Sequence, residues 1–144
     1  MILVDTTILV YAIGTEDPLR SPCRELLALI RDGLVRASAS VEVVQEFTHV
    51  RARRTTRPEA AARAREYALG LSPLVRPDDA DLREGLAIFE ALADLGAFGA
   101  VLAATARRRG WAVASADRSF DRVDRLTCLD PTSPGFLESA RGAG

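Results

Sequence analysis

The sequence predicts an α/β fold, an α/β/α sandwich in which a central, mainly parallel sheet lies between helices. Two observations predict it. Short, continuously apolar segments typical of buried parallel strands recur along the chain, and amphipathic helical segments separate them. Because parallel strands are joined through helices that cover both faces of the sheet, this alternation favours the sandwich. A chain of 144 residues fits one domain, which we expect to span 1–144.

The expected strands are short, and each is bounded by polar or turn residues. The first is the apolar run that ends at Asp5, and the third begins at Trp111 and ends at Asp117. A further segment, "SPLVRP", is short and extended and lies between two of the expected helices. The four strands are expected at 2–5, 34–39, 111–117 and 126–130.

Capping residues and apolar periodicity predict the helices. Ser40 caps a helix whose apolar positions recur at helical spacing, and Pro58 stands at the first helical position of the next one. Acidic residues suit the first turn of the helix that begins near Asp78. The helices are expected at 6–14, 17–33, 41–54, 58–70, 78–96 and 97–110, and the tail 131–144 is expected to be a loop.

The composition is that of a globular chain with a core of its own. Hydrophobic residues make up 48% of the chain, so no disulfide or metal is needed for folding. The two cysteines, Cys23 and Cys128, have no metal-ligand spacing, and we expect reduced thiols. The apolar start of the sequence has no basic segment and contains Asp5, so we expect a buried strand there and not a signal peptide, and no apolar run approaches about 18 residues. We therefore expect a soluble, cytoplasmic protein with no membrane partner.

The basic residues are unevenly distributed although the net charge is only −1. All 19 are arginine, and nine of them lie in the two stretches 51–65 and 107–109. A protein that binds a phosphate backbone around an acidic site would show this separation of charge. Arginines at helix ends that are simply solvated would show it as well.

Acidic residues lie at the ends of two expected strands. Asp5 ends the first strand and Asp117 follows the third, so both are expected at the same edge of the sheet if these strands are neighbours. Two carboxylates in one place repel each other unless a cation lies between them, and Mg²⁺ is a suitable cation because it prefers oxygen ligands. Glu46 adds a third acid beside the apolar stripe of its helix, and Glu42 competes for that role one turn earlier.

With these acids in place, the chain resembles the PIN-domain ribonucleases, specifically the VapC toxins of bacterial type II toxin–antitoxin pairs. No single piece of the resemblance is specific, but the ordered set spans nearly the whole chain. The matching pieces are "VDTTILVYA" with Asp5, "SVEVVQEF" with Glu46, "FGAVLAATARRRG", and "VASADRSFDRV" with Asp117 and Phe120.

The resemblance implies a mechanism and a set of partners. In that family three or four acids surround one or two Mg²⁺ or Mn²⁺ ions, and a metal-bound water attacks an RNA phosphodiester. Asp5 and Asp117 match metal ligands, and Glu46 matches a ligand or a base that acts through water. Members commonly form homodimers, and a VapB-like antitoxin covers the acidic site. The supporting residues would be Thr6 or Thr7 and Ser115, and the RNA contacts Arg51, Arg53, Arg54, Arg107, Arg108 and Arg109.

One position departs from the family pattern. Gly99 stands immediately before "AVLAATA", where the family carries an aspartate that would be a fourth metal-binding acid. Asp94 precedes it by five residues, across the expected helix break at Gly96, and replaces it only if the helix is redrawn. We therefore expect a metal site that lacks one carboxylate, and a nuclease whose activity is impaired.

Two other classes of function compete with this one. Enzymes that form an aspartyl phosphate also place an aspartate after a first parallel strand, but they rely on a lysine, and the chain has none. The second alternative is a catalytically inactive PIN domain that acts as a module for binding an antitoxin or RNA. Gly99 makes that alternative a serious one.

Overall fold

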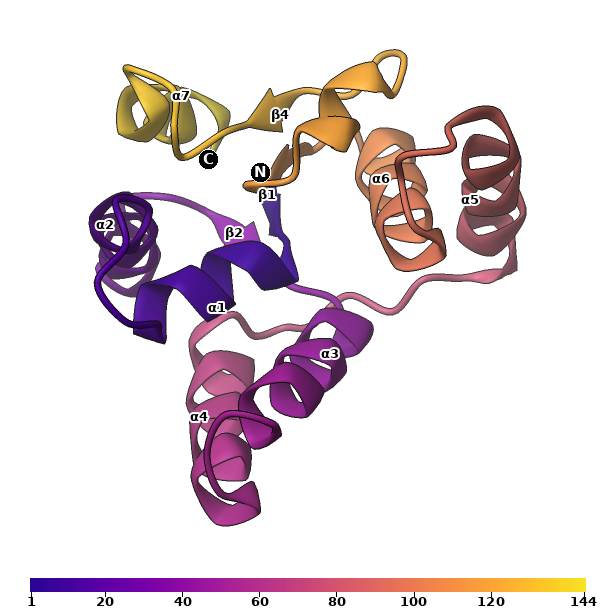
Figure 1. Cartoon of the computed structure of the whole chain (residues 1–144). Helices are drawn as coiled ribbons and strands as arrows, with labels where there is room; N and C mark the ends of the chain where they lie inside the picture. The colour runs from indigo at the N-terminus through magenta and orange to yellow at the C-terminus, as the bar shows by residue number, and fades with distance from the viewer.

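The computed structural model describes all residues from Met1 to Gly144. Its centre is a four-stranded sheet in which every pair of neighbouring strands is parallel, in the order β2-β1-β3-β4 (Figure 1). This confirms the predicted parallel α/β fold, although the strands are shorter than the sequence predicts. They are β1 (Ile2–Val4), β2 (Ala37–Ser38), β3 (Ala112–Ala114) and β4 (Cys128–Leu129).

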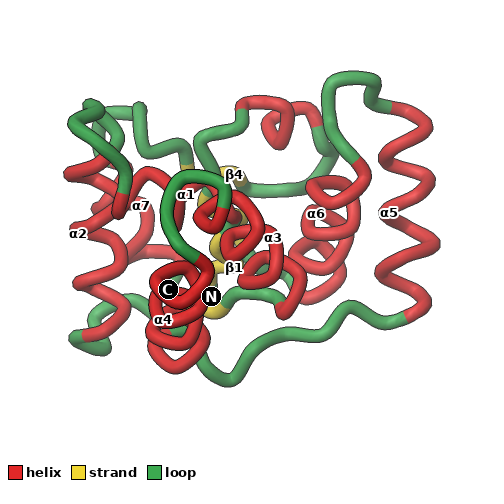
Figure 2. Tube along the Cα trace, turned by 60° about the horizontal axis from the view of Figure 1, so that its bottom comes forward, coloured by secondary structure: helices red, strands yellow, loops and turns green.

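Helices surround this sheet. In both ribbon views α2 and α7 lie to one side of the strands, and α6 and then α5 lie to the other (Figures 1 and 2). The expected α/β/α arrangement is therefore confirmed. The helices are α1 (Thr6–Ile13), α2 (Arg20–Arg31), α3 (Val41–Ala52), α4 (Arg57–Gly70), α5 (Asp79–Ala91), α6 (Ala97–Arg109) and α7 (Phe136–Ala143), with a 3-10 helix η1 (Arg118–Arg122).

The order of the strands creates a switch point. β1 has β2 on one side and β3 on the other, so the connections that leave the two central strands run in opposite directions. Ligand sites of open parallel sheets form at such a point, outside the carboxyl ends of the strands. All the residues of β1 and β3 are buried, which gives the chain segments that follow them a rigid base.

The tail is where the sequence-based expectation was wrong. Residues 131–144 were expected to form a loop, but Phe136–Ala143 is helix α7. Prolines and glycines at its start favoured the loop, whereas Phe136 and Ala140, one helical turn apart, are buried in the core and fix the helix. The same helix brings the two ends of the chain together: the Met1 ammonium donates to the Ala143 carbonyl.

A second boundary also differs from the expectation. The helix expected at 78–96 ends at Ala91, and Leu92 has an extended backbone. The residues up to Gly96 then form the turn between α5 and α6, which are closely packed along their length. None of the helices has the length and hydropathy that crossing a membrane requires.

Candidate active site

The carboxyl end of β1 positions the first acid. Asp5 is the N-cap of α1, and its Oδ2 accepts hydrogen bonds from the Thr7 backbone N–H at 3.3 Å and from the Thr7 hydroxyl at 2.7 Å. An aspartate at this place satisfies free N–H groups of the helix, so the local sequence explains its position. The residue is 8% exposed, which leaves a carboxylate edge at the surface of the site.

Ser115 connects this acid to the second one. Its buried hydroxyl donates to Asp5 Oδ2 at 2.7 Å and accepts from the Asp117 backbone N–H at 3.0 Å. Asp117 in turn caps η1 and accepts from the Ser119 N–H at 2.9 Å. The two strand-end aspartates are therefore tied to each other through one serine, in the supporting position that the sequence predicts for it.

The third acid comes from α3 and has its own tether. The Thr6 hydroxyl donates to Glu46 Oε2 at 2.5 Å, which connects the first residue of α1 to the middle of α3. Thr6 and Thr7 thus share the supporting role: one holds Glu46 and the other holds Asp5. The sequence alone does not distinguish between these two threonines.

The three acids line one pocket. It has a volume of about 630 Å³, and its wall also includes Gly99 and Arg54. A second pocket of about 370 Å³ shares Asp5, Glu46 and Gly99 with the first and is largely apolar. Glu42 lines only this second pocket, and its Oε2 is buried without a hydrogen-bond partner. The structure therefore brings Asp5, Glu46, Asp117 and the glycine position together around one hollow.

The three acids supply the kind of ligand atom that a hard divalent ion prefers, but they are not grouped closely in this structure. Each of the three acids keeps a carboxylate oxygen that accepts no hydrogen bond, and oxygen is the ligand that Mg²⁺ and Mn²⁺ prefer. However, no group of three or more Asp, Glu, His or Cys side chains lies close enough to hold a metal ion. The arrangement is thus an open acidic pocket and not a complete metal site.

Gly99 lies at the point where a further acid would enter. It is the third residue of α6, and a Cβ there would lie 2.7 Å from Leu95 Cδ1 and 3.4 Å from Phe120 Cζ. The tip of the buried Leu95 side chain therefore takes up the space of the missing side chain. Asp94 does not replace it: that residue is exposed, pairs with Arg122 and lies outside the wall of either pocket.

The arginines of the first basic stretch differ in what they contact. Arg51 makes a two-pronged ion pair with Glu59, at 2.9 and 2.8 Å, and hydrogen bonds from Arg51 and Thr55 lower the pKa of Glu59 to about 2. Arg54 is exposed and lines the larger acidic pocket, and Arg53 is exposed without an ion pair. Of these predicted RNA contacts, Arg54 is thus the one placed at the pocket.

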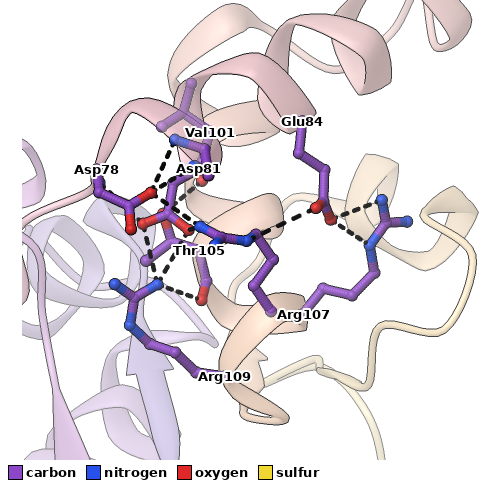
Figure 3. A network of polar contacts seen from close by, with 9 residues as sticks. Asp78, Asp81, Glu84, Val101, Thr105, Arg107 and Arg109 are labelled. Atoms are coloured by element: carbon purple, nitrogen blue, oxygen red, sulfur yellow. Dashed lines mark hydrogen bonds and ion pairs between the residues drawn. The ribbon is translucent and has the colours of Figure 1, made fainter.

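The arginines of the second basic stretch form ion pairs within the protein, which the predictions from the sequence do not include. Arg107 pairs with Glu84 at 2.9 Å, while Arg108 and Arg109 pair with Asp81 at 2.6 and 3.0 Å (Figure 3). Asp81 is 0% exposed, so its charge is balanced inside the protein. The pattern "DDAD", thirty residues before the arginines, was a signal for it. These three arginines hold α6 to α5. None of them contacts the three acids of the pocket.

Comparisons with known proteins agree with this geometry. The PIN domain family model matches residues 2–126. Ribonuclease VapC7 from Mycobacterium tuberculosis (strain ATCC 25618 / H37Rv) is 44% identical over 139 residues, which cover 95% of this chain and 96% of that protein.

Two solved structures have the same fold at low sequence identity. One is VapBC2 from Rickettsia felis bound to a DNA fragment from its promoter, with a TM-score of 0.69, 15% identity and coverage of 90% of this chain and 98% of that one. The other is FitAcB from Neisseria gonorrhoeae, with a TM-score of 0.69, 18% identity and coverage of 91% and 98%. From the family match and the VapC relative together, the chain belongs to the PIN-domain family and, within it, to the VapC toxins.

Proposed function

We propose that this protein is an endoribonuclease toxin of a type II toxin–antitoxin pair, which hydrolyses RNA phosphodiesters at the acidic pocket with the help of Mg²⁺ or Mn²⁺. The observation that carries the proposal is the set of three tethered carboxylates at the carboxyl end of the sheet, in a chain 44% identical to a protein named as a ribonuclease. Hydroxyl groups hold the carboxylates of Asp5 and Glu46, and the Ser119 N–H holds that of Asp117, as a site that must keep a fixed geometry requires.

The roles follow from where the side chains lie. Asp5, Asp117 and Glu46 are the catalytic and metal-binding carboxylates, and Ser115 and Thr6 orient them. Arg54, at the wall of the same pocket, is the arginine best placed for the phosphate backbone of an RNA strand. Arg51, Arg53 and Arg107 to Arg109 remain predicted contacts, of which Arg51 and the last three already have partners within the chain.

Activity of this sequence is proposed to be impaired. The pocket lacks the carboxylate that the family carries at position 99, so the three remaining acids offer an ion fewer ligand oxygens than the four-acid set. A cognate VapB-like antitoxin and a second copy of the chain are the proposed protein partners. They are supported by structural neighbours that are toxin–antitoxin complexes and by the family to which the chain belongs. The cytoplasm is the proposed location.

The test compares the wild type with Gly99→Asp and with Gly99→Asn, which has nearly the same shape but no charge. Cleavage of a labelled RNA and calorimetric binding of Mn²⁺ are measured for each. We expect Gly99→Asp to bind Mn²⁺ and cleave at least about 10-fold better than the other two, since even outer-shell changes cost about that much at metal sites. Asp5→Asn in the Gly99→Asp chain should abolish both. Equal cleavage by all three proteins would show that Gly99 does not impair the site.

A second candidate function is a PIN domain that has lost catalysis and binds only an antitoxin or RNA. The observation that favours it is Gly99, which leaves the pocket wall without a carboxylate at that position. Calorimetry of the wild type separates the two. Mn²⁺ uptake that Asp5→Ala abolishes supports the nuclease, and no specific uptake supports the binding module.

A further inference from the structure

The smaller pocket beside the acids differs in charge from the larger one. The wall of the larger pocket includes Arg54, a cation that suits a phosphate group. The wall of the smaller pocket, which has a volume of about 370 Å³, contains no basic residue: its charged residues are all acidic, and most of the others are apolar. Such a wall repels a phosphate, and it favours an uncharged, partly apolar group that donates hydrogen bonds.

The two pockets adjoin each other at the catalytic acids. Asp5, Glu46 and Gly99 line both of them. When a phosphate of an RNA strand lies at these acids, with Arg54 beside it, the base of an adjoining nucleotide is within reach of the smaller pocket. The positions of the charges therefore assign the backbone to the larger pocket and a base to the smaller one.

Phe98 provides a surface on which a base can stack. It is the second residue of α6, it is 67% exposed, and it lines both pockets. Leu82, which is 49% exposed, adds a second large apolar side chain to the wall of the smaller pocket. Proteins that bind single-stranded RNA hold its unstacked bases on aromatic side chains placed in this way.

Glu42 provides an acceptor whose buried oxygen has no partner in the chain. It lies in the first turn of α3 and lines only the smaller pocket, and its Oε2 is buried without a hydrogen-bond donor. The helix N-terminus favours an acid at this place, but a fully exposed carboxylate would gain the same attraction. A buried oxygen without a donor costs free energy, and an N–H group that enters the pocket removes this cost.

Among the four bases of RNA, guanine suits a carboxylate best. Its Watson–Crick edge carries two neighbouring N–H donors, and the two oxygens of a carboxylate accept both. Adenine and cytosine place a ring-nitrogen acceptor beside their one amino group, and uracil places its one N–H between two carbonyls. A carboxylate repels these acceptors, so it discriminates against the three other bases.

We propose that the smaller pocket, with Phe98 and Glu42, is the subsite for a guanine base next to the phosphodiester that is cleaved. Phe98 stacks on the ring and Glu42 accepts from the Watson–Crick edge, while Arg54 contacts the backbone at the larger pocket. This subsite rests on the proposed function for the position of the phosphate, and it makes the protein selective for single-stranded RNA that contains guanine.

The test measures how tightly the protein binds short RNAs in Mg²⁺, with gels to confirm that the RNA remains intact. The probes are fluorescein-labelled pentamers that differ in the central base, UUGUU, UUAUU, UUCUU and UUUUU, and anisotropy gives the dissociation constants. We expect the wild type to bind UUGUU at least about 10-fold more tightly than the other three. Glu42→Gln replaces one acceptor with a donor, so it should reduce this preference to about 3-fold or less without weakening the binding of UUUUU.

Further variants separate stacking from general surface effects. Phe98→Ala should weaken the binding of UUGUU about 5-fold or more, and Phe98→Trp, which keeps an aromatic face, should retain it. Glu138→Gln is the matched control for Glu42→Gln. Glu138 is also an acid in the first turn of a helix, but it is exposed and lines neither pocket, so all four dissociation constants should stay unchanged.

The outcomes distinguish this subsite from the nuclease activity itself. Equal binding of the four pentamers, no measurable binding of UUGUU, or a guanine preference that Glu42→Gln leaves intact would overturn the subsite. Binding of acetyl-arginine amide that Glu42→Gln abolishes, without any guanine preference, would assign the pocket to a cation and overturn it as well. A guanine preference in binding, with no cleavage by the wild type or by Gly99→Asp, would support the subsite and refute the nuclease.

Discussion

The two ends of α6 are built in opposite ways. At its C-terminal end, three consecutive arginines pair with Asp81 and Glu84 of α5 and with its N-cap Asp78, and Asp81 is fully buried. At its N-terminal end, Gly99 faces the acidic pocket without a side chain, and Leu95 takes up the space.

The ion pairs hold the C-terminal end of α6 to the start of α5. At the other end, the buried Ala100 and Ala103 hold α6 in the core, and Gly99 faces the pocket. A change confined to position 99 therefore has a small structural cost.

The largest effect is expected from removing the centre of the ion network. Asp81→Ala leaves Arg108 and Arg109 without their shared buried partner and should lower the free energy of unfolding by about 3–5 kcal/mol. Urea denaturation measures it. Asp78→Ala is the control: Asp78 is 59% exposed, and losing its ion pair and the cap it provides for α5 should together cost about 0.5–2 kcal/mol. Equal effects of the two changes would mean that burial of Asp81 is not what matters.

The second largest loss of stability is expected from a change at the close contact between the backbones of α5 and α6. Gly85→Ala puts a methyl group 2.7 Å from the Val101 Cα, a backbone atom that cannot turn aside. We expect a loss of about 1–3 kcal/mol, the usual cost of overpacking. Gly70→Ala makes the matched comparison, since a Cβ at Gly70 meets nothing within 4 Å and should stabilise α4 by up to about 1 kcal/mol. Thermal melts of both variants check the opposite signs.

At the other end of α6, Gly99→Asp should change stability by no more than about 1 kcal/mol. Higher helix propensity and attraction to the helix N-terminus stabilise the aspartate. Displacement of the Leu95 side-chain tip and repulsion from Asp5 destabilise it. The denaturation midpoint is the measurement. A loss as large as that from Asp81→Ala would contradict the idea that a side chain at position 99 has a small structural cost.

The smallest effect concerns an ion pair in a different helix pair, Arg51 with Glu59. Because the pKa of Glu59 is lowered to about 2, this pair adds stability above the unfolded value near 4.5 and loses that contribution as the pH falls toward 2. Glu59→Gln should therefore destabilise the protein at pH 7 and become indistinguishable from the wild type near pH 2. Denaturation curves at several pH values between these limits test the sign.

The sequence predicts the fold well wherever local pattern and packing agree. The apolar runs before Asp5 and before Asp117 are buried strands, and capping residues such as Ser40 begin helices where expected. The tail was missed because its helix depends on burial of Phe136 and not on local preference. Strand length was overestimated because pairing with a neighbour, which sequence pattern does not record, ends each strand.

For the candidate site, spacing predicts which acids meet but not how the space among them is filled. Asp5 and Asp117 are expected at one sheet edge from their positions at strand ends, provided that the two strands are neighbours. β1 and β3 are neighbours, and Ser115 connects the two residues. The partners of Arg107 to Arg109 lie 23 to 30 residues earlier, so the acidic pattern at 78–81 suggests partners for them, but only the packing of α5 against α6 fixes the pairs. The same holds for Leu95, whose position beside Gly99 depends on the turn between these helices.

The two ends of the chain lie so close together that a short linker could join them. The Met1 ammonium contacts the Ala143 carbonyl, and Arg36 donates to the Gly144 carbonyl at 3.4 Å. A linker of a few residues from Gly144 to Met1 would close the chain into a ring, and new ends opened in the exposed turn at 53–56 would give a circular permutant of the same fold. Because Arg54 of that turn lines the larger acidic pocket, a fluorophore or fused domain attached there would report from its rim.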